Sequence, residues 1–143
     1  FWYRKVLPIR NDKKVINKIK IAKRKEEKVM EEMKLVEFTD FMKLDIRVGT
    51  ILEAKIFEKA KKPAYQLTVD FGKEIGVKHS SAQITNCYEP KDLIGKQVLA
   101  VVNFPPKQIA NFISEVLVLG TYSKQGVVLI TPDKTVENGD KLG

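Results

Sequence analysis

The chain has 143 residues, of which 43% are hydrophobic, and its formal net charge is +8. These values fit one domain with enough apolar side chains for a core. No run approaches the roughly 20 consecutive apolar residues of a membrane helix, and no signal-peptide pattern is visible, so we expect no membrane insertion and a cytoplasmic protein. Cys87 is the single cysteine, which excludes an internal disulfide and fits a reducing compartment.

The positive charge is concentrated near the beginning of the chain. Residues 1–32 hold eleven Lys or Arg and five Asp or Glu, whereas residues 33–143 hold fifteen and thirteen. A basic surface attracts phosphate backbones, but lysine-rich helices are also a common way to keep a protein soluble. The charge alone does not choose between these two interpretations.

We expect residues 1–32 to form a basic helical extension, capped by Asn11 or Asp12. Five apolar residues fall close to one helical stripe, which Glu26 interrupts: Val15, Ile19, Ala22, Val29 and Met33. Three interpretations are open. The helix docks on its own domain or is simply solvated, it contacts RNA, or it is a non-native leader and Met33 is the true start.

The remaining residues, 33–143, are expected to form a barrel domain. A short helical turn is predicted at 38–44, with Thr39 or Asp40 as its cap and its apolar side chains facing inward. Residues 45–57 alternate as one long strand, in which Gly49 suggests a bulge or a bend. Residues 65–71 form a second strand with a hairpin partner at 75–78, and Ser80 or Ser81 is expected to cap a short helix at 82–88.

Three further apolar runs, at 98–102, 116–119 and 127–130, are too short for ordinary helices and indicate buried strands. A loop at 103–114 separates the first two runs. The order of elements predicts an all-β fold, a five-stranded Greek-key OB-fold barrel with short flanking helices.

The sequence offers little for catalysis. Its one histidine and one cysteine, His79 and Cys87, do not suggest a catalytic triad, and no zinc spacing or glycine-rich phosphate loop is present. We therefore expect a protein that is not an enzyme and that uses no cofactor and no metal.

Several separate blocks of the sequence resemble one known family. Asp45–Gly49 resembles the start of the tRNA-binding domain found in stand-alone tRNA-binding proteins and in extensions of methionyl-tRNA synthetase. The blocks at 80–85, 101–110 and 114–120 resemble the narrower branch of export-related CsaA chaperones. The resemblance runs from about Phe38 to Gly143 and implies a non-catalytic homodimeric barrel. It implies tRNA binding for the wider family and a chaperone role for unfolded or pre-export polypeptides in the branch.

An alternative is a structure-specific tRNA-binding protein with no chaperone role. The chain departs from the tRNA-binding relatives at Ser114–Leu117, where they carry a Ser-x-Gly-Met-type block, and at His79, where a Lys or Gln is expected. The segment after Thr131 and the turn at 38–44 are the expected dimer contacts.

In this fold the first hairpin loop and the loop between strands 4 and 5 flank one face. Lysines bind phosphates and aromatic rings stack on bases. The candidate RNA-binding residues are Arg47, Lys59, Lys61, Lys62, Lys78, Asn103, Lys107 and Ser114.

An apolar groove for extended polypeptide is the second candidate site. Its candidate residues are Phe104, Pro105, Pro106, Ile109 and Phe112. The plainer alternatives are a solvated lysine cluster, buried phenylalanines and prolines that only shape a turn.

Overall fold

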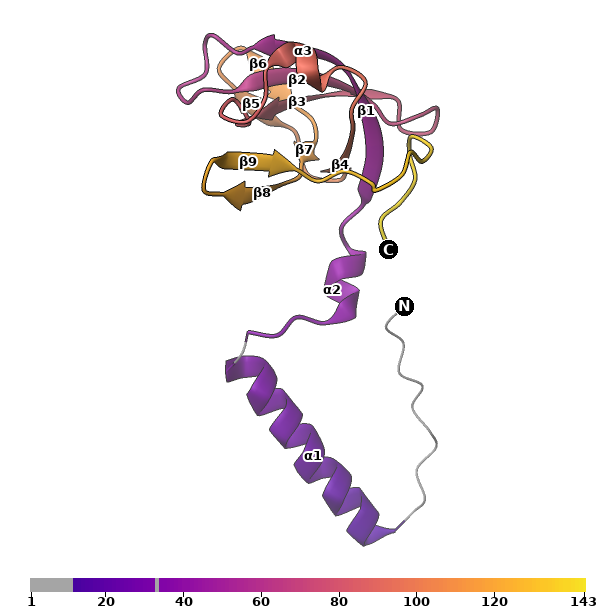
Figure 1. The fold of residues 1–143 in the computed structure, drawn as a ribbon. Helices are drawn as coiled ribbons and strands as arrows, with labels where there is room; N and C mark the ends of the chain where they lie inside the picture. Colours follow the sequence, from indigo (N-terminus) through magenta and orange to yellow (C-terminus); the bar gives the residue numbers. More distant parts are fainter. Residues whose placement is uncertain (1–11, 33) are drawn as a thin grey trace. The chain divides into compact units, whose positions relative to one another are not determined.

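A computed structural model describes residues 12–32 and 34–143, so the expectations placed on Asn11 and Met33 lie outside the described residues. The chain divides into two compact units, residues 1–43 and residues 44–143 (Figure 1). The expected boundary between residues 32 and 33 stays a prediction. Within the described ranges, no helix is long and apolar enough to cross a membrane.

The first unit contains helix α1 (Lys13–Glu32) and the short helix α2 (Phe38–Met42). Asp12 caps α1, because its Oδ1 accepts a hydrogen bond of 3.0 Å from the backbone N of Lys14. Glu37, rather than Thr39 or Asp40, is the cap residue of α2, and its backbone N donates to Asp40 Oδ2. No residue of α2 is buried, so the prediction that its apolar side chains face inward is wrong.

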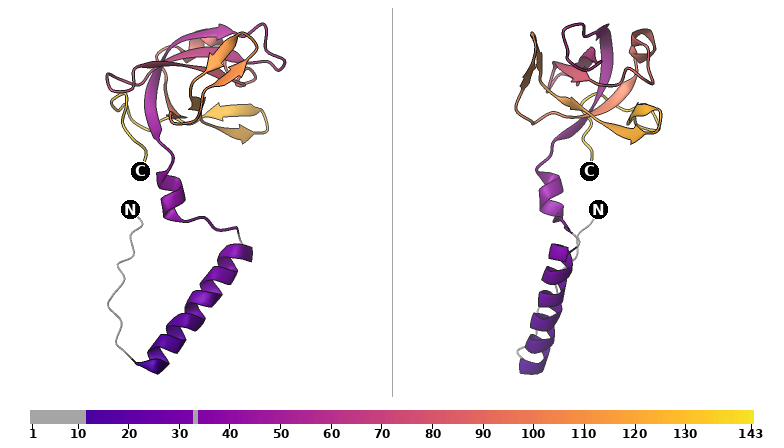
Figure 2. Two further views of the ribbon diagram at one scale, coloured as in Figure 1. Left: turned by 180° about the vertical axis from the view of Figure 1, so that it is seen from behind. Right: turned by 90° about the vertical axis from the view of Figure 1, so that its left-hand side faces the viewer.

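The second unit is a five-stranded antiparallel sheet that curls into a nearly closed barrel, which confirms the predicted OB-fold class (Figure 1). The strand order is β3-β2-β1-β4-β7. The strands are β1 (Ile46–Ile56), β2 (Tyr65–Asp70), β3 (Val77–Ala82), β4 (Gln97–Val101) and β7 (Leu117–Val118). Two hairpins form two-stranded sheets of their own (Figure 2): β5 (Lys107–Ile109) with β6 (Phe112–Ser114), and β8 (Gly120–Ser123) with β9 (Gly126–Leu129).

Two seams complete the barrel. At one, the backbone N of Glu115 donates to His79 O, while the backbone N of His79 donates to Glu115 Oε2, both at 2.8 Å. At the other, β2 pairs only with the second half of β1, and residues 139–142 run beside the first half. There Gly139 N donates to Val48 O, and Val48 N donates to Asp140 O. The first half of β1 therefore has a hydrogen-bonded neighbour on each side, β4 on one and residues 139–142 on the other.

Gly49 permits close packing inside this bend. A Cβ atom at position 49 would lie 2.6 Å from Val69 Cγ1 and 2.7 Å from Phe71 Cδ1. The irregularity in pairing falls later, between Ile51 and Glu53. The bulge is therefore not at the glycine, and the glycine instead makes room for the core.

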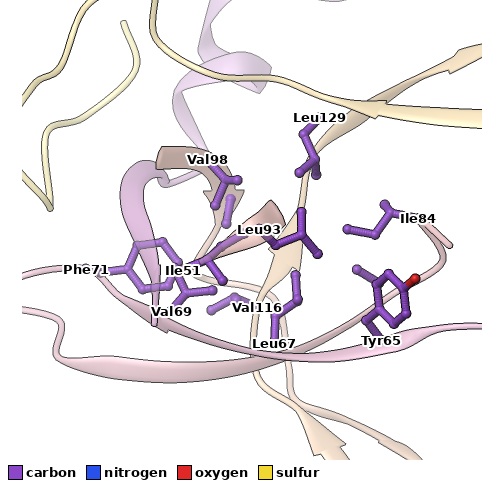
Figure 3. Close-up of a cluster of buried hydrophobic side chains, with 12 residues drawn as sticks. Ile51, Tyr65, Leu67, Val69, Phe71, Ile84, Leu93, Val98, Val116 and Leu129 are labelled. Atoms are coloured by element: carbon purple, nitrogen blue, oxygen red, sulfur yellow. The ribbon is translucent and has the colours of Figure 1, made fainter. Parts of the chain in front are cut away.

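The core is formed by side chains that point inward from all sides of the barrel (Figure 3). Ile51, Val69, Phe71, Leu93 and Val98 are completely buried. Burial of this kind is the main source of stability for a small barrel.

Two sequence predictions in the connections were wrong. Residues 80–82 continue strand β3, because Gln66 pairs with Ser81 and Tyr65 with Ala82, and this pairing overrides the capping tendency of serine. The short helix of this connection is α3 (Pro90–Leu93), beyond the predicted stretch. The segment at 103–114 is not a plain loop, since it contains the β5–β6 hairpin.

Candidate nucleic-acid interface

The connection between β1 and β2, residues 57–64, and the β5–β6 hairpin line one surface depression of about 590 Å³, which we call the lysine hollow. Four candidate RNA-binding residues meet there, three from the first connection and one from the hairpin: Lys59, Lys61, Lys62 and Lys107. The other lining residues are Ala60, Ala64, Ser81, Gln83, Gln108, Ile109 and Ala110. None of the residues lining this hollow is acidic.

The four lysines are free to meet an external anion. Among the residues that the structure describes, no carboxylate forms an ion pair with any of them. Four ammonium groups around one depression produce a local positive potential, which raises the concentration of phosphate-bearing ligands there. Such a site can bind a phosphate backbone through its charge, but phosphate contacts do not distinguish one base sequence from another.

A second depression of about 290 Å³, the apolar hollow, adjoins the lysine hollow. Its apolar lining includes three of the candidate peptide-binding residues, Phe104, Pro105 and Ile109, together with Val116 and Leu117. Phe104 is 43% exposed, which is a large exposure for a phenylalanine.

The two hollows share part of their walls. The residues common to both are Ser81, Gln83, Lys107 and Ile109. The lysine hollow and the apolar hollow are therefore two halves of one surface rather than two distant sites.

Phe112, another candidate of the peptide groove, lies elsewhere. Its ring packs edge-on against Phe57 at a centroid distance of 5.5 Å, and against the His79 ring at 6.1 Å. Phe57 is buried at the end of β1, so this stack joins β1, β3 and β6. Phe112 lines neither hollow, and its contacts hold the hairpin in place. Pro106 also lies outside both linings.

The structure places Arg47 away from the hollows. Its Nε donates to Asp45 Oδ1 at 2.6 Å, and its Nη1 donates to Gly139 O at 2.9 Å. The hydrogen bond to Asp45 raises the pKa of Arg47 above its ordinary value. This guanidinium therefore ties residue 139 to the start of β1.

The other three candidates have structural partners of different kinds. Asn103 Oδ1 accepts a 2.9 Å hydrogen bond from the backbone N of Asp45. Ser114 Oγ accepts one of 3.0 Å from Ser81 N and lines the apolar hollow. Lys78 lies on β3, where it pairs with Val69 of β2.

Sequence reasoning missed Ser81 and Gln83, which line both hollows. From the sequence, Ser81 is expected to cap a helix and Gln83 to lie within it, so neither residue is a candidate for the binding surface. Residues 77–82 read Val-Lys-His-Ser-Ser-Ala and show no alternation of apolar and polar side chains, so the sequence carries no local signal for a strand there.

Among residues 12–32 and 34–143, no cluster of three or more His, Cys, Asp or Glu side chains is placed to hold a metal ion. The side chains that line the two hollows can form ionic interactions through lysines, hydrogen bonds through glutamine amides, and apolar contacts.

Comparison with solved structures gives two chaperones of high similarity. The CsaA chaperone protein from Picrophilus torridus is 59% identical with a TM-score of 0.73, and the alignment covers 76% of this chain and 100% of that chain. Chaperone CsaA from Bacillus anthracis strain Ames is 52% identical with a TM-score of 0.72, and coverage is 76% and 99%.

Comparison with curated proteins gives methionine–tRNA ligases. That of Pyrococcus horikoshii is 39% identical over 130 residues, which is 91% of this chain. The chain spans only 17% of the length of that relative, so the similarity concerns one part of the ligase. Residues 46–141 match the family described as "Putative tRNA binding domain". That range takes in the whole barrel from β1 to residue 141, and the chain therefore belongs to the family of tRNA-binding domains.

Proposed function

We propose that this protein binds tRNA through the lysine hollow and catalyses no reaction itself. The observation that carries the proposal is the convergence of Lys59, Lys61, Lys62 and Lys107, from two connections, on a depression without acidic lining residues. Membership of the tRNA-binding domain family supports the choice of ligand. Among the remaining candidates, Lys78, Asn103 and Ser114 would add contacts to tRNA at the edge of this surface. Arg47 instead stabilises the fold through its hydrogen bonds to Asp45 and Gly139.

The test is a triple replacement of Lys59, Lys61 and Lys62 by Ala, with tRNA affinity measured between about 50 and 200 mM salt. We expect most of the binding to be lost, and the slope of log affinity against log salt to fall by about 2 to 3, because each phosphate contact contributes about 0.7 to 0.9. Replacing Lys73, Lys124 and Lys134, which are exposed and line neither hollow, is the control of equal charge. Equal losses in both triple variants would contradict the proposed site.

A chaperone role for unfolded or pre-export polypeptides is the second candidate function. The exposed Phe104 in a depression with Pro105 and Ile109 supports it, as does the similarity to two CsaA chaperones. An apolar surface of this kind takes extended chains by burial, without strict sequence preference. Pro106 would stiffen the rim. The competing proposal is a protein that acts on tRNA alone.

Phe104→Ala tests the chaperone role, with Ile94→Ala as the control at an apolar residue that lies outside both hollows and is 51% exposed, against 43% for Phe104. We expect only Phe104→Ala to weaken the suppression of aggregation of an unfolded client protein. Because the hollows share Lys107 and Ile109, tRNA and polypeptide should also compete. Full activity in Phe104→Ala would remove the apolar hollow from the chaperone proposal.

We further propose that the protein is cytoplasmic, serves protein export and forms a homodimer. Exposed apolar residues in the two segments expected at the dimer contact support the last point: Phe38, Met42, Val136 and Leu142. Sedimentation at micromolar concentration tests it, and a monomer would contradict it.

A further inference from the structure

One face of helix α1 carries apolar side chains that are substantially exposed. Five positions on this face are spaced alternately four and three residues apart: Val15, Ile19, Ala22, Glu26 and Val29. Val15, Ile19 and Val29 are 39%, 38% and 44% exposed. Alternating spacings of four and three are the heptad signature of a helix that packs along a partner helix. We call this row of residues the α1 seam.

The charges of α1 are divided between its two halves. Residues 13–25 contain seven basic and no acidic residues, whereas residues 26–32 contain four glutamates and one lysine. The first turn has no acidic residue and the last turn has no basic one. A helix dipole favours the reverse arrangement, since its N-terminal end is positive and its C-terminal end is negative. An isolated α1 is therefore destabilised by its own charge order.

We propose that α1 is an antiparallel pairing helix, whose occupant is α1 of a second copy of this chain. In that orientation the basic half of each helix lies beside the glutamates of the other, and the two helix dipoles oppose one another. Parallel pairing would instead place like charges together. The α1 seam is symmetric about position 24, so Ile19 of one copy meets Val29 of the second copy, and Ala22 meets Glu26 of the second copy.

Glu26 gives this pairing its register. A polar residue within an apolar seam costs stability but disfavours arrangements that leave it unpaired. Here the small side chain of Ala22 of the second copy leaves room for the carboxylate, and the basic stretch 23–25 of the second copy flanks that position. A shift of one heptad would instead face Glu26 with Val15 or Val29 of the second copy.

The surface of α1 has a recess where the partner's apolar side chain would sit. Lys25, Glu26, Val29 and Leu35 line a hollow of about 390 Å³, and all of them belong to the first unit. The proposed register brings Ile19 of the second copy beside Val29, at the edge of this hollow. Burying these side chains is the favourable term that drives the pairing.

An RNA ligand is a less complete account of α1. Its basic half would attract phosphates, but the four glutamates would repel them. Nor does RNA binding require apolar residues spaced four and three apart. Because the α1 seam spans fewer than three heptads, we expect a weak association that the experiment must capture covalently.

The experiment uses the full chain with Cys87→Ser, treated with ribonuclease. Protein carrying Ile19→Cys is mixed with protein carrying Val29→Cys under mild oxidation. We expect disulfides mainly between the two unlike proteins. Predominant linkage of like proteins would mean parallel pairing, and linkage only after tRNA is added would mean an RNA-dependent contact. Either result, or no linkage at all, would overturn the proposal.

A matched pair of variants shows whether the α1 seam itself is responsible. Val15→Asp or Ile21→Asp is added to the Ile19→Cys protein. Val15 lies on the α1 seam, whereas Ile21 is an exposed apolar residue of the same helix off the seam. Val15→Asp should slow the cross-linking about tenfold, equivalent to about 1.4 kcal/mol, whereas Ile21→Asp should leave it unchanged. An equal effect of both, with helix content unchanged by circular dichroism, would overturn the proposal.

Discussion

Helix α1 and the barrel both follow regular apolar patterns, but their apolar side chains have opposite fates. In the barrel, Ile51 and Val69 are fully buried among neighbours from distant parts of the chain. In α1, Ile19 occupies an equally regular position and is still exposed. The periodicity of apolar residues therefore predicts a helix or strand and its apolar face, whereas burial of that face depends on another segment that packs against it.

The largest contrast is expected from one pair of isoleucines. Ile51→Ala should lower the free energy of unfolding of the barrel by about 2–5 kcal/mol, because it leaves a cavity in a closed core. Ile19→Ala should change it by less than about 0.5 kcal/mol, because exposed substitutions rarely matter more. Urea denaturation of both variants measures the difference. Similar losses would mean that α1 is an integral part of the barrel core.

A smaller loss should follow from Arg47→Met. This change removes the hydrogen bonds from Arg47 to Asp45 and Gly139, so we expect a loss of about 1–3 kcal/mol in unfolding free energy. Affinity for tRNA should be almost unchanged in protein that is still folded. A loss of affinity without a loss of stability would mean that Arg47 contacts tRNA and does not serve mainly to stabilise the fold.

Glu115→Gln should cost still less, about 1 kcal/mol in the free energy of unfolding, because the amide oxygen can still accept from His79 N but without a charge. Thermal unfolding measures the shift. Glu74→Gln, at an exposed carboxylate whose distance to Arg47 is 3.9 Å, is the control and should change stability less. Equal shifts would mean that the hydrogen bond between His79 N and Glu115 Oε2 does not contribute to closure of the barrel.

The smallest effect on stability is expected from deleting residues 1–32. The barrel unit should keep its unfolding free energy within about 0.5 kcal/mol, because its core lies within residues 44–143. Affinity for tRNA should fall, since the deletion removes eleven basic and only five acidic residues and so weakens the long-range attraction of phosphates, even where α1 itself does not contact the RNA. Unfolding of the truncated protein would contradict the separation between the two regions, and unchanged affinity would mean that the charge of residues 1–32 does not act on tRNA.

The sequence was sufficient where a pattern is local. The alternation in β1 and β2 and the stripe of α1 identified these elements, and the lysines around residue 60 were recognised as a possible anion site. The sequence was insufficient where the conformation of a segment depends on pairing with a strand that is distant in the chain. Residues 80–82 look like a helix start by composition, but pairing with β2 makes them a strand. For the same reason Ser81 and Gln83 were missed, since their place between the hollows depends on β3.

The pairing of residues 139–142 with the first half of β1 has a consequence for synthesis. Ile46 and Val48 are made early, whereas the groups that satisfy their backbones come almost a hundred residues later. During translation this half-strand has an open flank until those residues leave the ribosome. Ribosome stalling or premature termination before residue 139 should therefore release an unfinished barrel that can recruit strands from other chains.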